Sequence, residues 1–385
     1  MAKIAFIDAG INTNYLRNPD RVVARFVVRD GRSEEYPLFT TSSDSICEDH
    51  GTMCARIFEH YAKDYDYQIV DIKVLNSIYD TDDNDNIGKG NIQDLNKALE
   101  LCLDLNVDII SMSLGSSLLS DSRYVRDIID ELNNNGVMIV AANSNSRKLS
   151  VPAVFPEVFG VEYDIWGILK PGEILYCPKD PLRIDIISAF KYEDEFPSNS
   201  YAVPIVTARI NKYISEGKNR RPEIVRAFME DCNNNELLAK KKYMTDEITC
   251  ELPHIKVITD EPPFIAYKYV RDMMDCLTDK HDCDCACLYS DGNVNDTHFF
   301  DMRQFDMPFN QIVSVVEKYA NLSVVISIWN TKGVPDDINA DVTITRESGQ
   351  IQITNDEGVA IYASLKSGKN LNGTQAGNIL ANVMR

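Results

Sequence analysis

The sequence lacks any long apolar run. Although 44% of its 385 residues are hydrophobic, no segment approaches the roughly 18 consecutive apolar residues of a membrane-spanning helix. The first residues, MAKIAFIDAGIN, contain an apolar stretch too short for the core of a secretory signal, and no small-residue cleavage site follows it. These absences predict a cytoplasmic protein that has no membrane partner.

Basic residues are scarce. The chain has 39 Lys and Arg residues against 59 Asp and Glu residues, which gives a formal net charge of −20. Because phosphate binding needs clustered Lys and Arg side chains, this balance argues against nucleic acid as a partner. The segment 254–385 also lacks a glycine-rich phosphate-binding loop, since SGKN (367–370) is too short to count as one. A basic or neutral partner remains compatible with the charge.

Cysteines are too dilute for a disulfide scaffold, with ten in 385 residues. In a cytoplasm they are expected to be reduced thiols. One cluster invites a metal interpretation, in the segment CLTDKHDCDCACL: Cys276, His281, Cys283, Cys285 and Cys287. Zinc sites prefer Cys residues separated by two to four others, whereas the last three alternate inside a predicted strand and share one face. We therefore predict buried thiols, with no metal and no cofactor, and keep metal binding as the alternative.

The first 215 residues alternate between strand and helix patterns. Strands are predicted at 3–10, 68–75, 107–115 and 137–144, and helices at 50–62, 91–106 and 124–136. This alternation predicts βαβ units that form a parallel sheet with helices on both faces. Ligands bind such sheets beyond the carboxyl ends of the strands. Asp8, Ser113 and Asn145 are the polar residues that fall there.

A second alternation begins at residue 254. Helix and strand patterns run through HIKVIT, PFIAYKYVRDMMDCLTDK, CDCACLYS, FNQIVSVVEKYAN and LSVVISIW, and three period-two strands and a final helix follow. We predict a fold of the α/β class with three parts: a first domain at 1–217, a helical linker at 218–253 and a smaller α/β domain at 254–385.

Three polar residues suggest chemistry. Asp8 ends a strand, His50 opens a helix in DHGT, and Ser200 opens a later helix in SNSYAVP. Asp, His and Ser in this order form one of the known linear orders of a serine-hydrolase triad. A serine needs a neutral imidazole to take its proton and a carboxylate to orient that imidazole. Each residue also has a purely structural interpretation, and for Ser200 that interpretation is a helix cap.

Five segments resemble the subtilisin-like serine proteases, the subtilases, in the order of that family. The segments are IAFIDAGIN, DHGTMCARI, VDIISMSLGS, GVMIVAANSNSRKLSVPAVFPEVFGV and SNSYAVPIVTARI, and together they cover about residues 3–215. The resemblance implies a subtilisin-like fold and a serine endopeptidase.

The resemblance assigns roles residue by residue. It implies that Asp8 orients the imidazole, that His50 is the general base and then the general acid, and that Ser200 attacks the scissile carbonyl. Alignment from Gly136 onward places Asn145 at the oxyanion position. An edge that pairs with extended substrate is implied for Ser113, Leu114 and Gly115.

Some residues depart from the family pattern. Ser198 and Asn199 replace the usual Gly-Thr before the nucleophile, and Tyr201 replaces Met. Ser144 replaces the Gly before the oxyanion Asn, and if that position needs a positive φ, a serine there strains the loop. These departures leave open the alternative of an inactive scaffold that binds peptides without cutting them.

Secreted subtilases carry a signal and an inhibitory prodomain, and here the Asp-bearing strand starts at residue 3. We therefore expect a cytoplasmic endopeptidase that is selective for a dedicated peptide, such as the leader of a ribosomally made peptide. The domain at 254–385 is the candidate for holding that peptide substrate.

An acidic loop at 79–90 has side chains suited to calcium but lacks an EF-hand frame, so a solvated loop is the favoured interpretation. The sequence gives no indication of the oligomeric state.

Overall fold

The computed structural model describes residues 1–38, 50–76, 88–178, 180–192, 197–232, 251–334, 338–347, 350–363 and 372–383. The chain divides into two compact units. The first unit comprises Met1–Ser117 and Asp121–Lys240, and the second comprises Leu118–Ser120 and Lys241–Arg385.

The first unit contains a nine-stranded sheet in the order β3-β2-β4-β1-β5-β6-β7-β9-β8. Its strands are β1 (Ala2–Asp8), β2 (Val22–Arg29), β3 (Arg32–Glu35), β4 (Tyr67–Lys73), β5 (Ile109–Met112), β6 (Met138–Ala142), β7 (Val158–Tyr163), β8 (Ile174–Tyr176) and β9 (Ile186–Ser188). All neighbouring strands pair in parallel except β2 with β3 and β8 with β9. Every residue of β5 and β6 is buried, as expected for parallel strands that are covered on both faces.

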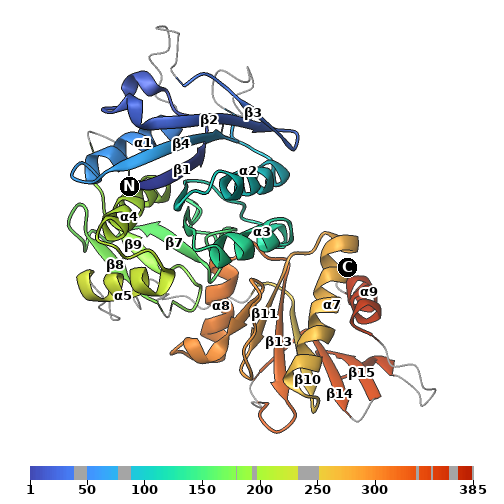
Figure 1. The fold of residues 1–385 in the computed structure, drawn as a ribbon. Coiled ribbons are helices and arrows are strands. Elements are labelled where there is room, and N and C mark those ends of the chain that lie inside the picture. The colour runs from blue at the N-terminus through green and yellow to red at the C-terminus, as the bar shows by residue number, and fades with distance from the viewer. Residues whose placement is uncertain are drawn as a thin grey trace. The chain divides into compact units, whose positions relative to one another are not determined.

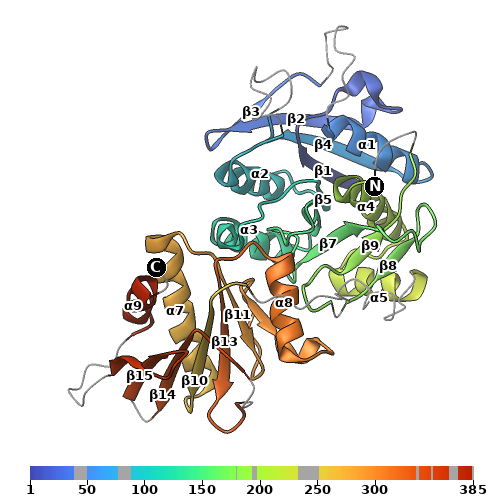
Figure 2. The same cartoon turned by 180° about the vertical axis from the view of Figure 1, so that it is seen from behind.

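Helices cover both faces of this sheet, as Figures 1 and 2 show from opposite sides. One face is covered by α1 (His50–Tyr61), α4 (Asn199–Ser215) and α5 (Arg221–Asp231), and the other by α2 (Ile92–Asp104) and α3 (Ser122–Asn134). The main core lies under the first group, where Phe58 of α1 and Val206 of α4 join Phe6 and Val140 of the sheet. Short 3₁₀ turns occupy Thr13–Tyr15, Pro19–Arg21, Leu119–Asp121 and, in the second unit, Met302–Gln304.

The predicted α/β fold class is confirmed. β1, β5 and β6 are adjacent in the sheet and parallel, so their carboxyl ends lie along one edge. Asp8 is the last residue of β1, Ser113 directly follows β5, and Asn145 follows β6 by three residues. This edge also receives the first turns of α1 and α4, which carry His50 and Ser200.

The second unit contains a seven-stranded mixed sheet in the order β12-β11-β13-β10-β14-β15-β16. Its strands are β10 (His254–Thr259), β11 (Cys285–Tyr289), β12 (Phe299–Asp301), β13 (Val324–Asn330), β14 (Val342–Glu347), β15 (Gln350–Asn355) and β16 (Ala360–Ala363). The first five in spatial order are parallel, and β15 and β16 add an antiparallel edge. One face is covered by α7 (Pro263–His281) and α9 (Gly373–Val383), and the other by α8 (Phe309–Tyr319) (Figures 1 and 2).

The cysteine cluster lies mostly in the core of this unit. Cys285 and Cys287 are fully buried on the face that packs against α7. Burial raises the pKa of both thiols, which keeps them protonated. The prediction that Cys283 belongs to the strand is wrong, because β11 begins only at Cys285. Cys283 instead lies in the turn after α7, where its carbonyl accepts a hydrogen bond from the Thr278 hydroxyl at 3.0 Å.

Three further observations bear on the sequence-based expectations. Among the described residues, no helix has the length and apolar character needed to cross a membrane. Residues 79–87 of the acidic loop predicted at 79–90 lie outside the described residues. The eight cysteines in the described ranges are all free thiols.

Candidate active site

Asp8 and His50 form a hydrogen-bonded pair in which the aspartate is buried and the imidazole is 35% exposed. The Asp8 side chain is 3% exposed, and its two carboxylate oxygens lie 2.8 and 3.0 Å from His50 Nδ1. Oδ1 also accepts a hydrogen bond from the Ala9 backbone N–H at 2.7 Å, which fixes the carboxylate. Because a carboxylate only accepts, His50 carries its proton on Nδ1, and Nε2 is left as the basic nitrogen.

Close packing between the chain after β1 and the start of α1 brings Asp8 and His50 together. A Cβ atom on Gly51 would lie 2.5 Å from the Gly10 carbonyl oxygen, so only glycine allows α1 to begin this near the chain that leaves Asp8. The Thr52 hydroxyl adds a second link, since it accepts a hydrogen bond from the Asn12 N–H at 2.8 Å. The His-Gly-Thr sequence therefore fixes where the imidazole stands.

The pKa of His50 is raised well above its ordinary value of 6.5. Burial lowers this pKa, but the Asp8 carboxylate raises it and wins. Cys54 lies one helical turn away, with its Sγ 4.0 Å from His50 Nδ1. Burial raises the pKa of that thiol, so Cys54 is neutral and Asp8 is the main cause of the shift.

Asp8, His50 and Cys54 also form the one group in the described part of the chain whose ligand atoms are close enough for a metal ion, all within 4.8 Å of one another. The arrangement suits a metal poorly, because Nδ1 carries the proton donated to Asp8 and the thiol is buried and protonated.

The residue that caps α4 is Ser198. Its Oγ accepts a hydrogen bond from the Tyr201 N–H at 3.2 Å, and its backbone is extended, with φ −150° and ψ 156°. Ser200 lies inside the first turn and does not serve as the cap. The structural interpretation of Ser200 as a helix cap is therefore wrong, and its hydroxyl is available for another purpose.

Ser200 is tied to the end of β5. Its Oγ lies 3.3 Å from the Ser113 carbonyl oxygen, and its own carbonyl accepts a 2.7 Å hydrogen bond from the Ser113 hydroxyl. Within the described residues, no hydrogen bond joins Ser200 Oγ to His50. The neighbouring Tyr201 ring stacks on the His50 ring, with centroids 5.5 Å apart and planes 23° apart. The start of α4 and the imidazole are therefore neighbours.

Asn145 lies against the same helix start. Its Oδ1 accepts a hydrogen bond from the Asn199 backbone N–H at 2.8 Å. A backbone N–H only donates, so the atom facing it must be the amide oxygen, and the NH₂ group points elsewhere. That NH₂ group has no other partner among the described residues, which leaves two donors beside the residue that precedes Ser200.

The comparisons with known proteins now bear on this geometry. The subtilase family model matches residues 1–224, more than half of the chain. The chain belongs to the subtilase family. The expected membership is confirmed.

Individual relatives of this subtilase match less than half of the chain. Minor extracellular protease Epr of Bacillus subtilis (strain 168) is 32% identical over 162 residues, which are 41% of this chain and 23% of that protein. Subtilisin amylosacchariticus of Bacillus subtilis subsp. amylosacchariticus is 27% identical over 165 residues, which are 41% of this chain and 40% of that protein. The chain thus spans less than half the length of these curated relatives. Among solved structures, Sphericase gives a TM-score of 0.43 at 19% identity, covering 59% of this chain and 82% of that one.

Asn199, one of the departures from the subtilase pattern, holds the site together. Its side-chain oxygen accepts from the Tyr163 N–H at 2.8 Å, and its NH₂ group donates to the carbonyls of Asn143 at 3.1 Å and Ser144 at 2.8 Å. With the contact to Asn145, four hydrogen bonds join Asn199 to β7 and to the loop after β6. Sequence reasoning missed this role, because the partners lie 36 to 56 residues away.

The strain expected at Ser144 is not present. Ser144 is not among the described residues with a positive φ, whereas Arg147, three residues later, has φ 65°. This subtilase therefore takes a serine before Asn145 without backbone strain.

The predicted substrate edge divides into two parts. Ser113 is buried and bonded to Ser200, whereas the backbone groups of Leu114 and Gly115 make no hydrogen bond in the described structure. Ser116 then pairs with Val151 in an antiparallel bridge. A Cβ atom on Gly115 would lie 2.8 Å from the Val151 carbonyl oxygen, which explains the glycine.

Proposed function

We propose that this subtilase is a serine endopeptidase. In this proposal Asp8 orients His50, His50 is the general base and then the general acid, and Ser200 is the nucleophile. The observation that carries the proposal is the 2.8 Å Asp8–His50 hydrogen bond beside a serine that does not cap its helix. The alternative is a subtilase-like scaffold that binds peptides without cutting them.

The reaction follows from these positions. Ser200 Oγ attacks the scissile carbonyl carbon while His50 Nε2 takes the hydroxyl proton, and the same nitrogen then protonates the leaving amine. Water enters and attacks the acyl carbon while His50 Nε2 takes one of its protons, and the same nitrogen returns that proton to Ser200 Oγ as the bond between Ser200 and the acyl group breaks. The imidazolium that forms twice is stabilised by the Asp8 carboxylate, whose pull on the proton is already visible in the raised pKa of His50.

A fluorophosphonate probe tests the proposal directly. The native chain should become covalently labelled, and peptide mapping should place the label on Ser200. Replacing His50 with alanine should slow the labelling by several orders of magnitude, because the hydroxyl loses its base. A native chain that stays unlabelled while its circular dichroism shows a folded protein would favour the scaffold.

Asn145 and the Ser200 N–H are the proposed oxyanion donors. Asn145→Ala should lower kcat by about 10²–10³-fold with little change in KM, a magnitude that comes from subtilisin itself. The reason is that the donor acts on charge that develops only in the transition state. Steady-state kinetics on a chromogenic peptide measure the effect.

Asn199 is the positioning residue in the same proposal. Asn199→Ala should also lower kcat, and the Asn145→Ala, Asn199→Ala double variant should be less impaired than the product of the two effects, because the second change disturbs a donor already lost. Ser146→Ala, in the exposed turn beside Asn145, is the matched control and should keep its kcat. Fully multiplicative effects would contradict the positioning role.

The substrate is proposed to be a dedicated peptide, such as the leader of a ribosomally made peptide. The support is the second unit, an α/β fold of its own that the subtilase family model does not cover. A unit that holds one peptide raises the local concentration of that peptide at the protease. Deleting residues 254–385 should then raise KM for the full peptide while leaving fluorophosphonate labelling of Ser200 intact.

A further inference from the structure

Tyr201 directly follows the proposed nucleophile and lies against the proposed general base. Its ring and the His50 imidazole have centroids 5.5 Å apart, and their planes differ by only 23°. The usual subtilase residue at this position is Met, so this chain places an aromatic face where the family pattern has a thioether. An aromatic face can act on the charge of an imidazole, which a flexible apolar chain cannot.

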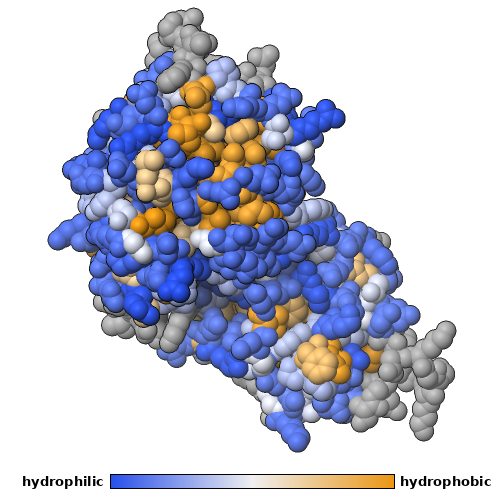
Figure 3. Space-filling model, viewed as in Figure 1, coloured by the Kyte–Doolittle hydropathy of each residue, from blue (hydrophilic) through white to orange (hydrophobic). Residues whose placement is uncertain are grey.

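The Tyr201 ring is held in this position from the interior of the first unit. The Phe190 ring stands nearly perpendicular to it, with centroids 5.7 Å apart and planes at 79°. Tyr201 also packs against a buried apolar cluster that joins α1 to α4 and includes Phe190: Met53, Ile57, Phe190 and Ile205. Each member is at most 8% exposed, so the cluster contributes almost nothing to the apolar surface, drawn in orange, that Figure 3 shows on this unit.

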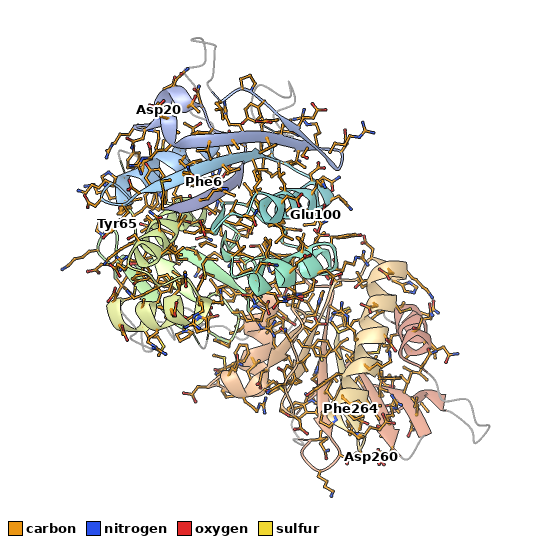
Figure 4. All side chains as sticks on the ribbon, viewed as in Figure 1. Phe6, Asp20, Tyr65, Glu100, Asp260 and Phe264 are labelled. Carbon is orange, nitrogen blue, oxygen red and sulfur yellow. The ribbon has the colours of Figure 1, made fainter. Side chains whose placement is uncertain are left out.

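Helix α1, which carries His50, is fixed to the sheet. Phe58 of α1 and Phe6 of β1 have ring centroids 5.5 Å apart and planes at 70°, and Figure 4 labels Phe6 on β1 inside the first unit. Asp8, two residues after Phe6, holds the Nδ1 edge of the imidazole at 2.8 Å. The stack of Tyr201 on His50 is therefore formed without any substrate, as expected of a group that acts in the transition state.

A stacked tyrosine acts differently on the two protonation states of His50. A neutral imidazole gains only ring packing from Tyr201, whereas an imidazolium is a cation beside the electron-rich face of the ring. Two other titratable groups face His50: the Asp8 carboxylate from β1 and the Cys54 thiol from α1. Because the thiol is protonated, Asp8 supplies the negative charge at one edge of the imidazole and Tyr201 covers a face of it.

We propose that Tyr201 positions His50 and stabilises the imidazolium that forms each time His50 takes a proton. Tyr201 exchanges no proton itself. The proton moves to His50 Nε2 from Ser200 or from water and leaves again, and the ring only lowers the free energy of the charged state. What this says of catalysis rests on the proposed function, whereas the contact between the ring and the imidazolium does not.

The first measurement is the pKa of His50 in the full chain. Histidine side-chain signals are followed by NMR as the pH is raised, and the signal that disappears in His50→Gln identifies His50 among the five histidines. Tyr201→Met, which restores the usual residue of the family, should lower this pKa, so that the imidazole binds its proton about three- to tenfold more weakly. Tyr201→Phe keeps the aromatic face and should leave the pKa in place.

The direction of the change separates charge stabilisation from simple covering. Burial lowers the pKa of His50, so removal of a ring that merely covered the imidazole would let this pKa rise. A lower pKa in Tyr201→Met means that the ring attracts the charge.

Turnover is the second measurement. At a pH where His50 is neutral, Tyr201→Met should lower kcat about three- to tenfold with little change in KM, because the charge on His50 develops only in the transition state. Ile57→Val is the matched control for packing, since it removes one methyl group from the same apolar cluster. It should lower the free energy of unfolding but leave kcat and the pKa of His50 in place.

A pKa of His50 that rises or stays constant in Tyr201→Met would overturn the proposal. An equal fall in Tyr201→Phe would also overturn it, because the hydroxyl and not the ring face would then be the cause. An unchanged kcat in Tyr201→Met would overturn the catalytic part. If circular dichroism shows that Tyr201→Met does not fold, Tyr201→Leu gives the same comparison. Because the NMR titration needs no turnover and fluorophosphonate labelling is measured separately on Ser200, failure of the ring contact and failure of the peptidase are distinguishable.

Discussion

Ser200→Ala should lower kcat for peptide hydrolysis by about 10⁶-fold, to the level that transition-state binding alone sustains; this magnitude comes from subtilisin itself. The physical reason is the loss of the one hydroxyl that stands at the start of α4 without serving as its cap. Alanine fits the position, because Ser200 is buried and its hydroxyl has a single long contact to Ser113, at 3.3 Å. The protein should therefore fold normally, and single-turnover assays on a chromogenic peptide measure the loss.

The matched control is Ser198→Ala, two residues earlier. This change removes the cap hydrogen bond to the Tyr201 N–H and should lower the free energy of unfolding by about 1 kcal/mol, while most of the turnover remains. Urea unfolding and kcat are measured on both variants. Ser198→Ala should lose stability and keep most of its kcat, whereas Ser200→Ala should keep its stability and lose its kcat. Equal loss of turnover in the two variants would show that the serine pair acts through helix α4 rather than through one nucleophile.

The central strands of the sheet in the first unit could be predicted from the sequence because their residue pattern is typical of buried parallel strands. β1, β5 and β6 are short, largely apolar runs, and each ends in or is directly followed by a polar residue: Asp8, Ser113 and Asn143. The edge of the same sheet could not be predicted in this way. β2 has buried residues only at every third position and lies beside a largely exposed β3, and β8 and β9 are only three residues long. Short or half-exposed strands carry too little periodicity to be recognised.

The candidate site, like the sheet, could be predicted from the sequence only in part. The sequence order and local context of Asp8, His50 and Ser200 suggested a triad, and the structure places Asp8 and His50 in direct contact. What the sequence could not decide was which serine caps α4, because Ser198 and Ser200 both suit a helix start. The backbone of Ser198 and its bond to Tyr201 answer that question.

The role of Asn199 could not be predicted from the sequence at all. Its four hydrogen bonds reach β7 and the loop after β6, segments that meet it only once the sheet has formed. In the sequence it stands as a departure from the subtilase pattern and suggests a weakened site. In the structure, its NH₂ group donates to the Asn143 carbonyl and adds a second hydrogen bond to the Ser144 carbonyl, which also accepts from the Arg147 N–H.

Asp8→Asn should lower kcat by about 10⁴-fold while leaving the fold intact, the magnitude known for serine proteases whose orienting aspartate is replaced. The replacement keeps the shape of the side chain but removes the charge that holds the proton on His50 Nδ1. An amide can donate to that nitrogen as well as accept from it, so part of the imidazole adopts the wrong tautomer, with its proton on Nε2. Such an imidazole cannot take the proton of Ser200.

The pH profile separates this electrostatic role from a structural one. His50 must be neutral to act as a base, and Asp8 raises its pKa, so the acid limb of kcat/KM for the native chain should lie above pH 6.5. In Asp8→Asn the carboxylate is gone while burial, which lowers the pKa, remains, so the acid limb should move to lower pH. Cys54→Ala is the control: its thiol is protonated and carries no charge, so its removal should leave the acid limb in place. An acid limb that moves with Cys54 and not with Asp8 would mean that the thiol, and not the carboxylate, sets the proton affinity of the base.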